Sequence, residues 1–121
     1  METEELRKRT KEFAHRWIKV AMALPDTPLG RHIRGKLIRC STSVASNYRA
    51  VCIAQSKASF ISKLSIVLEE ADESYFWLEF IIDEGLLKKE VIEPLLKEAG
   101  ELTSIFVASR KTARGKRTNF Q

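Results

Sequence analysis

Apolar side chains recur at alternating steps of three and four residues in four separate stretches of this chain. That spacing places them along one face of an α-helix, whereas a half-buried β-strand needs a period of two, and no run of that kind occurs. The four stripes cover residues 6–24, 33–51, 60–81 and 92–106. The chain is therefore predicted to be all-α, with four helices.

Residues that start or stop helices separate the stripes. Pro25 follows the first stripe, and Thr27 followed by Pro28 is typical of an N-cap with proline at the first helical position. Ser56 can cap the third helix, and Gly85 can end it. Helices of similar length joined by short connections pack antiparallel. We therefore predict an antiparallel up-and-down four-helix bundle over residues 1–110.

Pro94 complicates the start of the fourth helix, because it removes a backbone donor and disfavours the helical conformation at Glu93. Either the regular helix begins near Glu93, or residues 88–93 form a turn that Pro94 kinks. The favoured interpretation is one helix with a weak first turn.

The length of 121 residues allows one domain with its own core. The first residues lack the basic start and apolar run of a signal peptide, and no stretch approaches about 18 uncharged apolar residues. Cys40 and Cys52 lie on one predicted helix, roughly 18 Å apart along its axis, so they cannot bridge within a subunit. Reduced thiols and a cytoplasmic protein are expected.

Charge is segregated along the sequence. Residues 27–68 hold seven basic residues and no acid, whereas residues 69–109 hold eleven acids and three lysines. Residues 110–121 hold five basic residues and no acid, so residues 111–121 are predicted to form a basic, disordered tail. Segregated charge can steer a polyanion, or it can join complementary surfaces of two copies of the chain.

The second helix is predicted to present its arginines away from the core, as a basic ridge without interspersed acids. We predict that this ridge and the C-terminal basic residues bind the phosphate backbone of RNA or DNA, with weak sequence preference and strong salt dependence. An ordinary solvated face is the alternative. The predicted nucleic-acid-binding residues are Arg31, Arg34, Arg39, Arg49, Arg110, Lys111, Arg114, Lys116 and Arg117.

Two features predict contact with further helices. The third helix is apolar over more than one narrow stripe, which favours contact with another subunit, although its aromatic residues could instead wrap a wide core. Asn47 lies beside the core stripe of the second helix, where an unsatisfied buried amide costs about 1 to 3 kcal/mol. We expect Asn47 to bond to a neighbouring helix or subunit and to fix the register.

No catalytic constellation is found. A di-metal bundle needs two Glu-x-x-His pairs, but only Glu12 and His15 form one. The pairs Glu69–Asp72, Glu70–Glu73 and Glu98–Glu101 have a spacing found in magnesium-dependent nucleotide hydrolases, although acidic helices produce it by chance. No cofactor or metal is expected, and the chain is predicted not to be an enzyme; such a hydrolase is the least favoured alternative.

Three segments carry a family resemblance: residues 43–50 (SVASNYRA), 56–64 (SKASFISKL) and 69–79 (EEADESYFWLE). They resemble the four-helix bundle family encoded in intervening sequences of bacterial 23S rRNA genes, and the likeness extends from Thr10 to about Arg110. It implies an antiparallel bundle that assembles as a homopentamer with a central channel. Within these segments the residues expected to be structural or to lie in an interface are Asn47, Tyr48, Phe60 and Trp77.

The chain is similar also to accessory variability determinant proteins of diversity-generating retroelements. That resemblance implies basic pentamers that bind nucleic acid and a reverse transcriptase. Residues 1–109 of this chain balance to zero net charge, which confines nucleic-acid binding to the ridge and tail. We therefore expect a self-associating, pentameric bundle that binds RNA or DNA, without a membrane partner. The alternative is a protein–protein scaffold that binds no nucleic acid.

Overall fold

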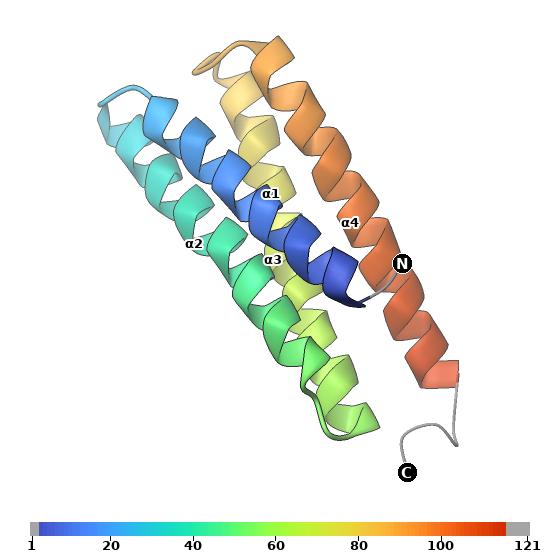
Figure 1. The fold of residues 1–121 in the computed structure, drawn as a ribbon. Coiled ribbons are helices and arrows are strands. Elements are labelled where there is room, and N and C mark those ends of the chain that lie inside the picture. Colours follow the sequence, from blue (N-terminus) through green and yellow to red (C-terminus); the bar gives the residue numbers. More distant parts are fainter. Residues whose placement is uncertain (1–2, 116–121) are drawn as a thin grey trace.

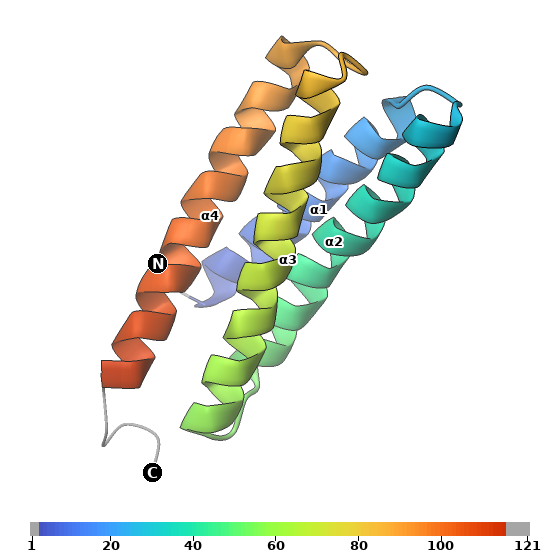
Figure 2. The ribbon, with the colours of Figure 1, turned by 180° about the vertical axis from the view of Figure 1, so that it is seen from behind.

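The computed structural model describes residues 3–115, which form four α-helices and their connections (Figure 1). The helices are α1 (Thr3–Ala23), α2 (Pro28–Cys52), α3 (Lys57–Asp83) and α4 (Lys89–Gly115). Successive helices run in opposite directions, as Figures 1 and 2 show from two sides. The predicted all-α, antiparallel up-and-down four-helix bundle is confirmed.

Helices that follow one another in the chain pack along their lengths, whereas α1 and α4 close the bundle with the least contact. The start of α1, the α2–α3 turn and the end of α4 lie at one end of the bundle (Figure 1). We call this the N-terminal end. The α1–α2 and α3–α4 turns lie at the other end. Residues 40 positions apart or more can therefore share one end of the molecule.

The predicted helix boundaries follow from local hydrogen bonds. The Thr27 hydroxyl accepts a hydrogen bond from the Gly30 N–H at 3.0 Å, with Pro28 beginning α2. Gly30 is required at this turn, because a Cβ there would overlap the Pro25 carbonyl oxygen. The Ser56 hydroxyl accepts from the Ser59 N–H at 3.0 Å. Both predicted N-caps are confirmed.

The start of α4 agrees with the prediction, but its end does not. The helix runs without a break through Pro94, which stands in its second turn, so the favoured interpretation of one continuous helix is confirmed. The helix also continues to Gly115. Lys111 and Arg114 are therefore helical, and the helical part ends five residues beyond the predicted boundary at 110. Residues 116–121 of the predicted tail lie outside the described residues.

The four predicted stripes meet in one core. Its largest fully buried side chains include Phe13 and Trp17 of α1, whose ring centroids are 4.7 Å apart, and Phe106 of α4. Cys40 is buried, Cys52 is half-buried and both are free, as predicted. Within residues 3–115, no helix has an apolar stretch long enough to cross a membrane.

Candidate anion-binding groove

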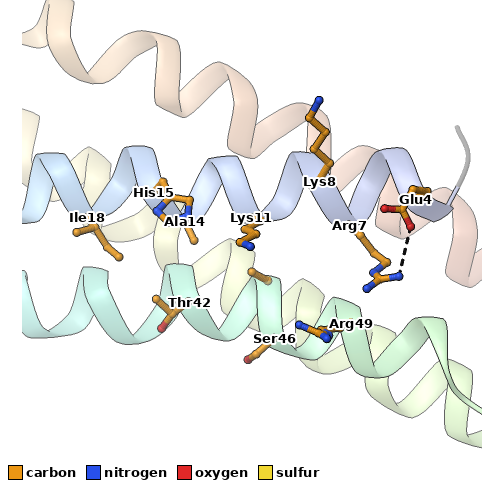
Figure 3. Close-up of a pocket in the computed structure, with 11 residues that line it drawn as sticks. Glu4, Arg7, Lys8, Lys11, Ala14, His15, Ile18, Thr42, Ser46 and Arg49 are labelled. Carbon is orange, nitrogen blue, oxygen red and sulfur yellow. Dashed lines mark hydrogen bonds and ion pairs between the residues drawn. The ribbon is translucent and has the colours of Figure 1, made fainter.

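A groove of about 560 Å³ runs between the outer faces of α1 and α2 (Figure 3). The α1 residues that line it follow at steps of three and four, so they form one face of that helix. Four α2 residues line the other side. The lining residues are Glu4, Arg7, Lys8, Lys11, Ala14, His15, Ile18, Thr42, Ala45, Ser46 and Arg49.

Small side chains leave this space open. Ala14 is buried and Ala45 half-buried where α1 and α2 meet, and neither side chain extends beyond its Cβ. Longer side chains stand on both sides, with Lys11 on α1 and Arg49 on α2 (Figure 3). The groove therefore has a mainly apolar floor and charged rims. A hollow of about 430 Å³ continues it past Arg49 to Ile53 at the N-terminal end.

Four bases and one acid line the groove, although the Lys8 ammonium points away from α2 (Figure 3). Arg7 forms an exposed ion pair with that acid, Glu4, at 3.3 Å. Lys8, Lys11 and Arg49 have no carboxylate within salt-bridge distance among residues 3–115. A local excess of unpaired positive charge over an apolar floor is suited to binding an anion that also presents apolar surface.

The predicted ridge on α2 is divided by this arrangement. Arg49 lies in the groove, but Arg31 donates to the Asp26 carboxylate at 2.9 Å. Arg34 donates to the backbone oxygens of Ala21 and Leu24 and so caps the end of α1. The expectation of a continuous ridge without acids is therefore corrected: the sequence block contains no acid, but residues from outside it reach two of these arginines.

Arg39 is the second arginine of the predicted ridge that pairs with acids from outside the sequence block. It forms the centre of a polar cluster between α2 and α3. Its guanidinium donates to Glu70 at 2.9 Å and to Glu73 at 2.6 Å. The Cys40 thiol and the Trp77 indole N–H also donate to Glu73, at 3.1 and 3.3 Å. These donors, Cys40 first, lower the pKa of Glu73. Burial raises the pKa of Cys40 to about 12, so the thiol keeps its proton.

Two of the three predicted carboxylate pairs are held by arginine. Ligand atoms of Cys40, Glu70 and Glu73 lie within 4.8 Å of one another, but a metal ion there would have to displace the Arg39 guanidinium. Glu98 accepts two hydrogen bonds from Arg9 of α1, at 2.7 and 2.8 Å. The next carboxylate, Glu101, pairs with Arg9 at 3.4 Å. These carboxylates thus tie helices together.

Comparison with known proteins identifies the fold family. The model of the 23S rRNA-intervening sequence protein family matches residues 2–108. The chain belongs to this family. It is also similar to a crystal structure from Bacteroides thetaiotaomicron, a protein of unknown function from the S23 ribosomal protein family. The identity is 29%, the TM-score is 0.84, and the alignment covers 92% of this chain and 99% of the other. No match is found among curated proteins.

The residues that carry the family resemblance lie mostly in and around the core. Tyr48 is buried with its ring 5.5 Å from that of Phe106, and Phe60 packs against the core. Trp77 is half-buried next to the exposed ring of His32, 5.6 Å away. Asn47 forms no hydrogen bond to a neighbouring helix among residues 3–115, because its amide donates to the backbone oxygen and hydroxyl of Ser43, one turn earlier in the same helix, at 2.9 and 2.8 Å. A bond from Asn47 to another subunit stays a prediction.

Three groove residues, Arg7, Lys8 and Lys11, were not among the residues predicted from the sequence. Their segment has nearly balanced charge, so a count of charges along the sequence passes over it. The signal that could have found them is spatial, because these bases line one groove in which Glu4 is the one acid among the described lining residues.

The described C-terminal bases, Arg110, Lys111 and Arg114, lie in the last turns of α4. Arg110 donates to the Ser65 hydroxyl at 3.3 Å, while Lys111 and Arg114 are exposed in the last turns of α4. Those turns lie at the N-terminal end, where the groove also opens (Figure 1). Lys116 and Arg117 lie outside the described residues.

Proposed function

We propose that this protein is a non-enzymatic, self-associating bundle that binds the phosphate backbone of RNA or DNA in the α1–α2 groove. The observation that carries the proposal is the pair of bases Lys11 and Arg49, which face one groove from two helices without carboxylate partners among residues 3–115 (Figure 3). Because these side chains come from two helices, positive charge stands on both sides of the groove.

The dimensions of the groove favour an extended anion. Its α1 wall runs from Glu4 to Ile18, which is about 21 Å of helix at about 1.5 Å per residue. Phosphates along one strand of duplex DNA are about 3.4 Å apart along the axis, so several can lie within that length. Ala14 and Ala45 offer no side-chain hydrogen bonds, and the Thr42 and Ser46 hydroxyls already donate to backbone oxygens of their own helix, which supports weak sequence preference.

The exposed bases of α4 extend this surface. Lys111 and Arg114 stand at the same end of the bundle as the opening of the groove, so a strand that leaves the groove there meets further positive charge. We therefore keep these residues in the proposed interface, with Arg49 from α2. Arg31, Arg34 and Arg39 have intramolecular partners and are assigned a smaller contribution.

A binding role is favoured over catalysis by the state of the carboxylates. Glu70 and Glu73 are engaged by Arg39, and Glu98 by Arg9. A magnesium-dependent nucleotide hydrolase would need such pairs free to ligate the ion. A scaffold without nucleic-acid binding is the second candidate, supported by Phe76 of α3, whose side chain is half exposed.

The test compares two double variants that change the net charge equally. Lys11→Glu/Arg49→Glu reverses charge in the groove, and Lys88→Glu/Lys97→Glu reverses charge on exposed lysines elsewhere. Binding of a labelled single-stranded RNA and of duplex DNA is followed by fluorescence anisotropy from about 50 mM salt upwards. We expect the groove variant to lose affinity about tenfold or more and the salt slope to fall by about 1 to 2.

The control variant should bind within about threefold of wild type, because its lysines lie outside the groove. Equal losses in both variants would show that net charge alone attracts the nucleic acid. Absence of binding by wild type at about 50 mM salt, where phosphate contacts are strongest, would refute the proposed function.

A further inference from the structure

The solvent-exposed face of α3 is acidic. Glu69, Asp72, Phe76, Glu79 and Asp83 follow one another at steps of three and four, so they share one face of the helix, and all five are exposed. None of the four carboxylates forms an ion pair among residues 3–115. We call these five residues the acidic stripe.

An exposed aromatic ring stands in the middle of the acidic stripe. Phe76 is 50% exposed, although its ring packs 5.0 Å from Trp77 and 5.9 Å from Phe80. Ile66, one turn before the stripe, is 40% exposed. A helix that carries apolar residues on its outer face as well as its inner face has more apolar surface than one bundle can cover. The acidic stripe therefore has the composition of a contact surface.

The α1–α2 groove is complementary to the acidic stripe in charge, polarity and length. Its rims carry unpaired Lys11 and Arg49, and its floor is mainly apolar. The helix from Ile66 to Asp83 spans about 26 Å, compared with about 21 Å for the α1 wall of the groove. A helix ridge packed in a groove between two helices is the ordinary geometry of helix association.

We propose that the acidic stripe of a second copy of this chain occupies the groove, and that nucleic acid competes with it for the same bases. The competition rests on the function proposed above, whereas the contact between copies does not. Assembly then masks the basic groove, and a polyanion binds only where the stripe is displaced.

The contact is heterologous, because groove and stripe are different surfaces of the same molecule. The groove of each copy can therefore bind the stripe of one neighbour, while its own stripe binds in the groove of another. Repetition of this contact gives a closed ring or an open filament, depending on the rotation between neighbours. The groove uses residues 42–49, in the last third of α2, whereas the stripe uses residues 69–83, in the second half of α3, which runs in the opposite direction away from the N-terminal end. Neighbouring copies must therefore be inclined or staggered along their axes.

The first experiment reverses charge on the stripe. Asp72→Lys/Glu79→Lys is compared with Glu90→Lys/Glu93→Lys, which makes the same change on exposed α4 residues. Mass is measured by light scattering at about 50 mM salt, and thermal unfolding checks the fold of each variant. We expect the stripe variant to be monomeric and to bind labelled RNA several-fold more tightly than wild type, because its groove is vacant. The α4 control should assemble like wild type.

The second experiment restores the contact with exchanged charges. Lys11→Glu/Arg49→Glu should abolish both assembly and RNA binding. Mixed with the stripe variant, it should form complexes, because its acidic groove then fits a basic stripe. A chain carrying all four reversals should assemble again and still fail to bind RNA in the groove.

Failure of the four-reversal chain to assemble, when its unfolding temperature matches that of wild type, would overturn the contact. A wild type that is monomeric at about 50 mM salt would overturn it as well. Assembly as expected with no RNA binding by any variant would instead refute the proposed function and leave the contact between copies supported.

Discussion

Arg39 and Arg49 belong to the same helix, and both are exposed, yet their surroundings are opposite. Arg39 faces α3 and is held by Glu70 and Glu73 at 2.9 and 2.6 Å. Arg49 faces α1 and shares the groove rim with Lys11, without a carboxylate within salt-bridge distance among residues 3–115. The difference comes from the neighbouring helix and not from α2 itself.

This comparison shows how a charge block in the sequence becomes a charge pattern in space. Each helix of an up-and-down bundle meets two neighbours, and α2 meets the acidic α3 on one side and the mixed α1 on the other. Arginines on the α3 side become ties between helices. Arginines on the α1 side keep their charge available. The following predictions test this division into paired and unpaired arginines.

The largest loss of stability is expected at the tie between α1 and α4. Arg9→Met removes a bidentate pair with Glu98 whose side chains are 22% and 17% exposed. The carboxylate would remain mostly buried without its donor, so we expect the free energy of unfolding to fall by about 2 kcal/mol. Urea denaturation measures this change.

Arg9→Lys is the matched control for that prediction. Lysine keeps the charge but cannot form two parallel hydrogen bonds to one carboxylate, so an intermediate loss is expected. If Arg9→Met unfolds at the same urea concentration as wild type, the packing of α1 against α4 does not depend on this pair.

Arg39→Met should have a smaller effect on stability. Its side chain is 51% exposed, so solvent screens the pair with Glu73, and the expected loss is about 1 kcal/mol. Part of that loss is the cost of leaving Glu70 and Glu73 side by side without a counter-charge. Glu73→Gln in the same background should recover some stability, and no recovery would show that repulsion is not the cause.

The fold could be predicted from the sequence because its signals are local. Thr27 and Ser56 each satisfy an N–H three residues later, and the predicted core residues Trp17 and Phe106 are both fully buried. Pro94 was ambiguous because it stands one turn inside the helix, where proline removes one backbone hydrogen bond but does not prevent the later turns from forming. The end of α4 at Gly115 was missed because composition favours disorder in a basic segment even where helix continues.

The site was predicted only in part, because pairing depends on which helix lies beside each residue. The sequence placed Arg39 and Arg49 in one ridge, but the carboxylates that neutralise Arg39 are more than 30 residues away. Conversely, Lys11 gains its role from Arg49, on the next helix. Helical periodicity gives the face of one helix, and only the packed bundle gives the partner of that face.

Low pH should weaken the ion pair between Arg9 and Glu98. Hydrogen bonds from Arg9 hold the pKa of Glu98 below its ordinary value of 4.5, so the unfolded chain binds more protons in this range. Stability from this pair is therefore present above about pH 4.5 and is lost as the pH falls through the lower pKa of the folded state. Urea denaturation between about pH 6 and 3 should show a shallower pH dependence for Arg9→Met than for wild type. Identical slopes would argue against the lowered pKa.

Removing an unpaired arginine should cost almost no stability. Arg49→Met leaves no carboxylate without a partner among residues 3–115, and methionine can cover the same apolar floor, so the free energy of unfolding should change by less than about 0.5 kcal/mol. Its affinity for RNA at low salt should fall about threefold, with a salt slope smaller by about 1. Arg39→Met should show the reverse, with stability reduced and affinity nearly unchanged. If both variants lost affinity equally, the pairing of Arg39 would not remove it from the RNA-binding surface, and the division drawn here between the two sides of α2 would fail.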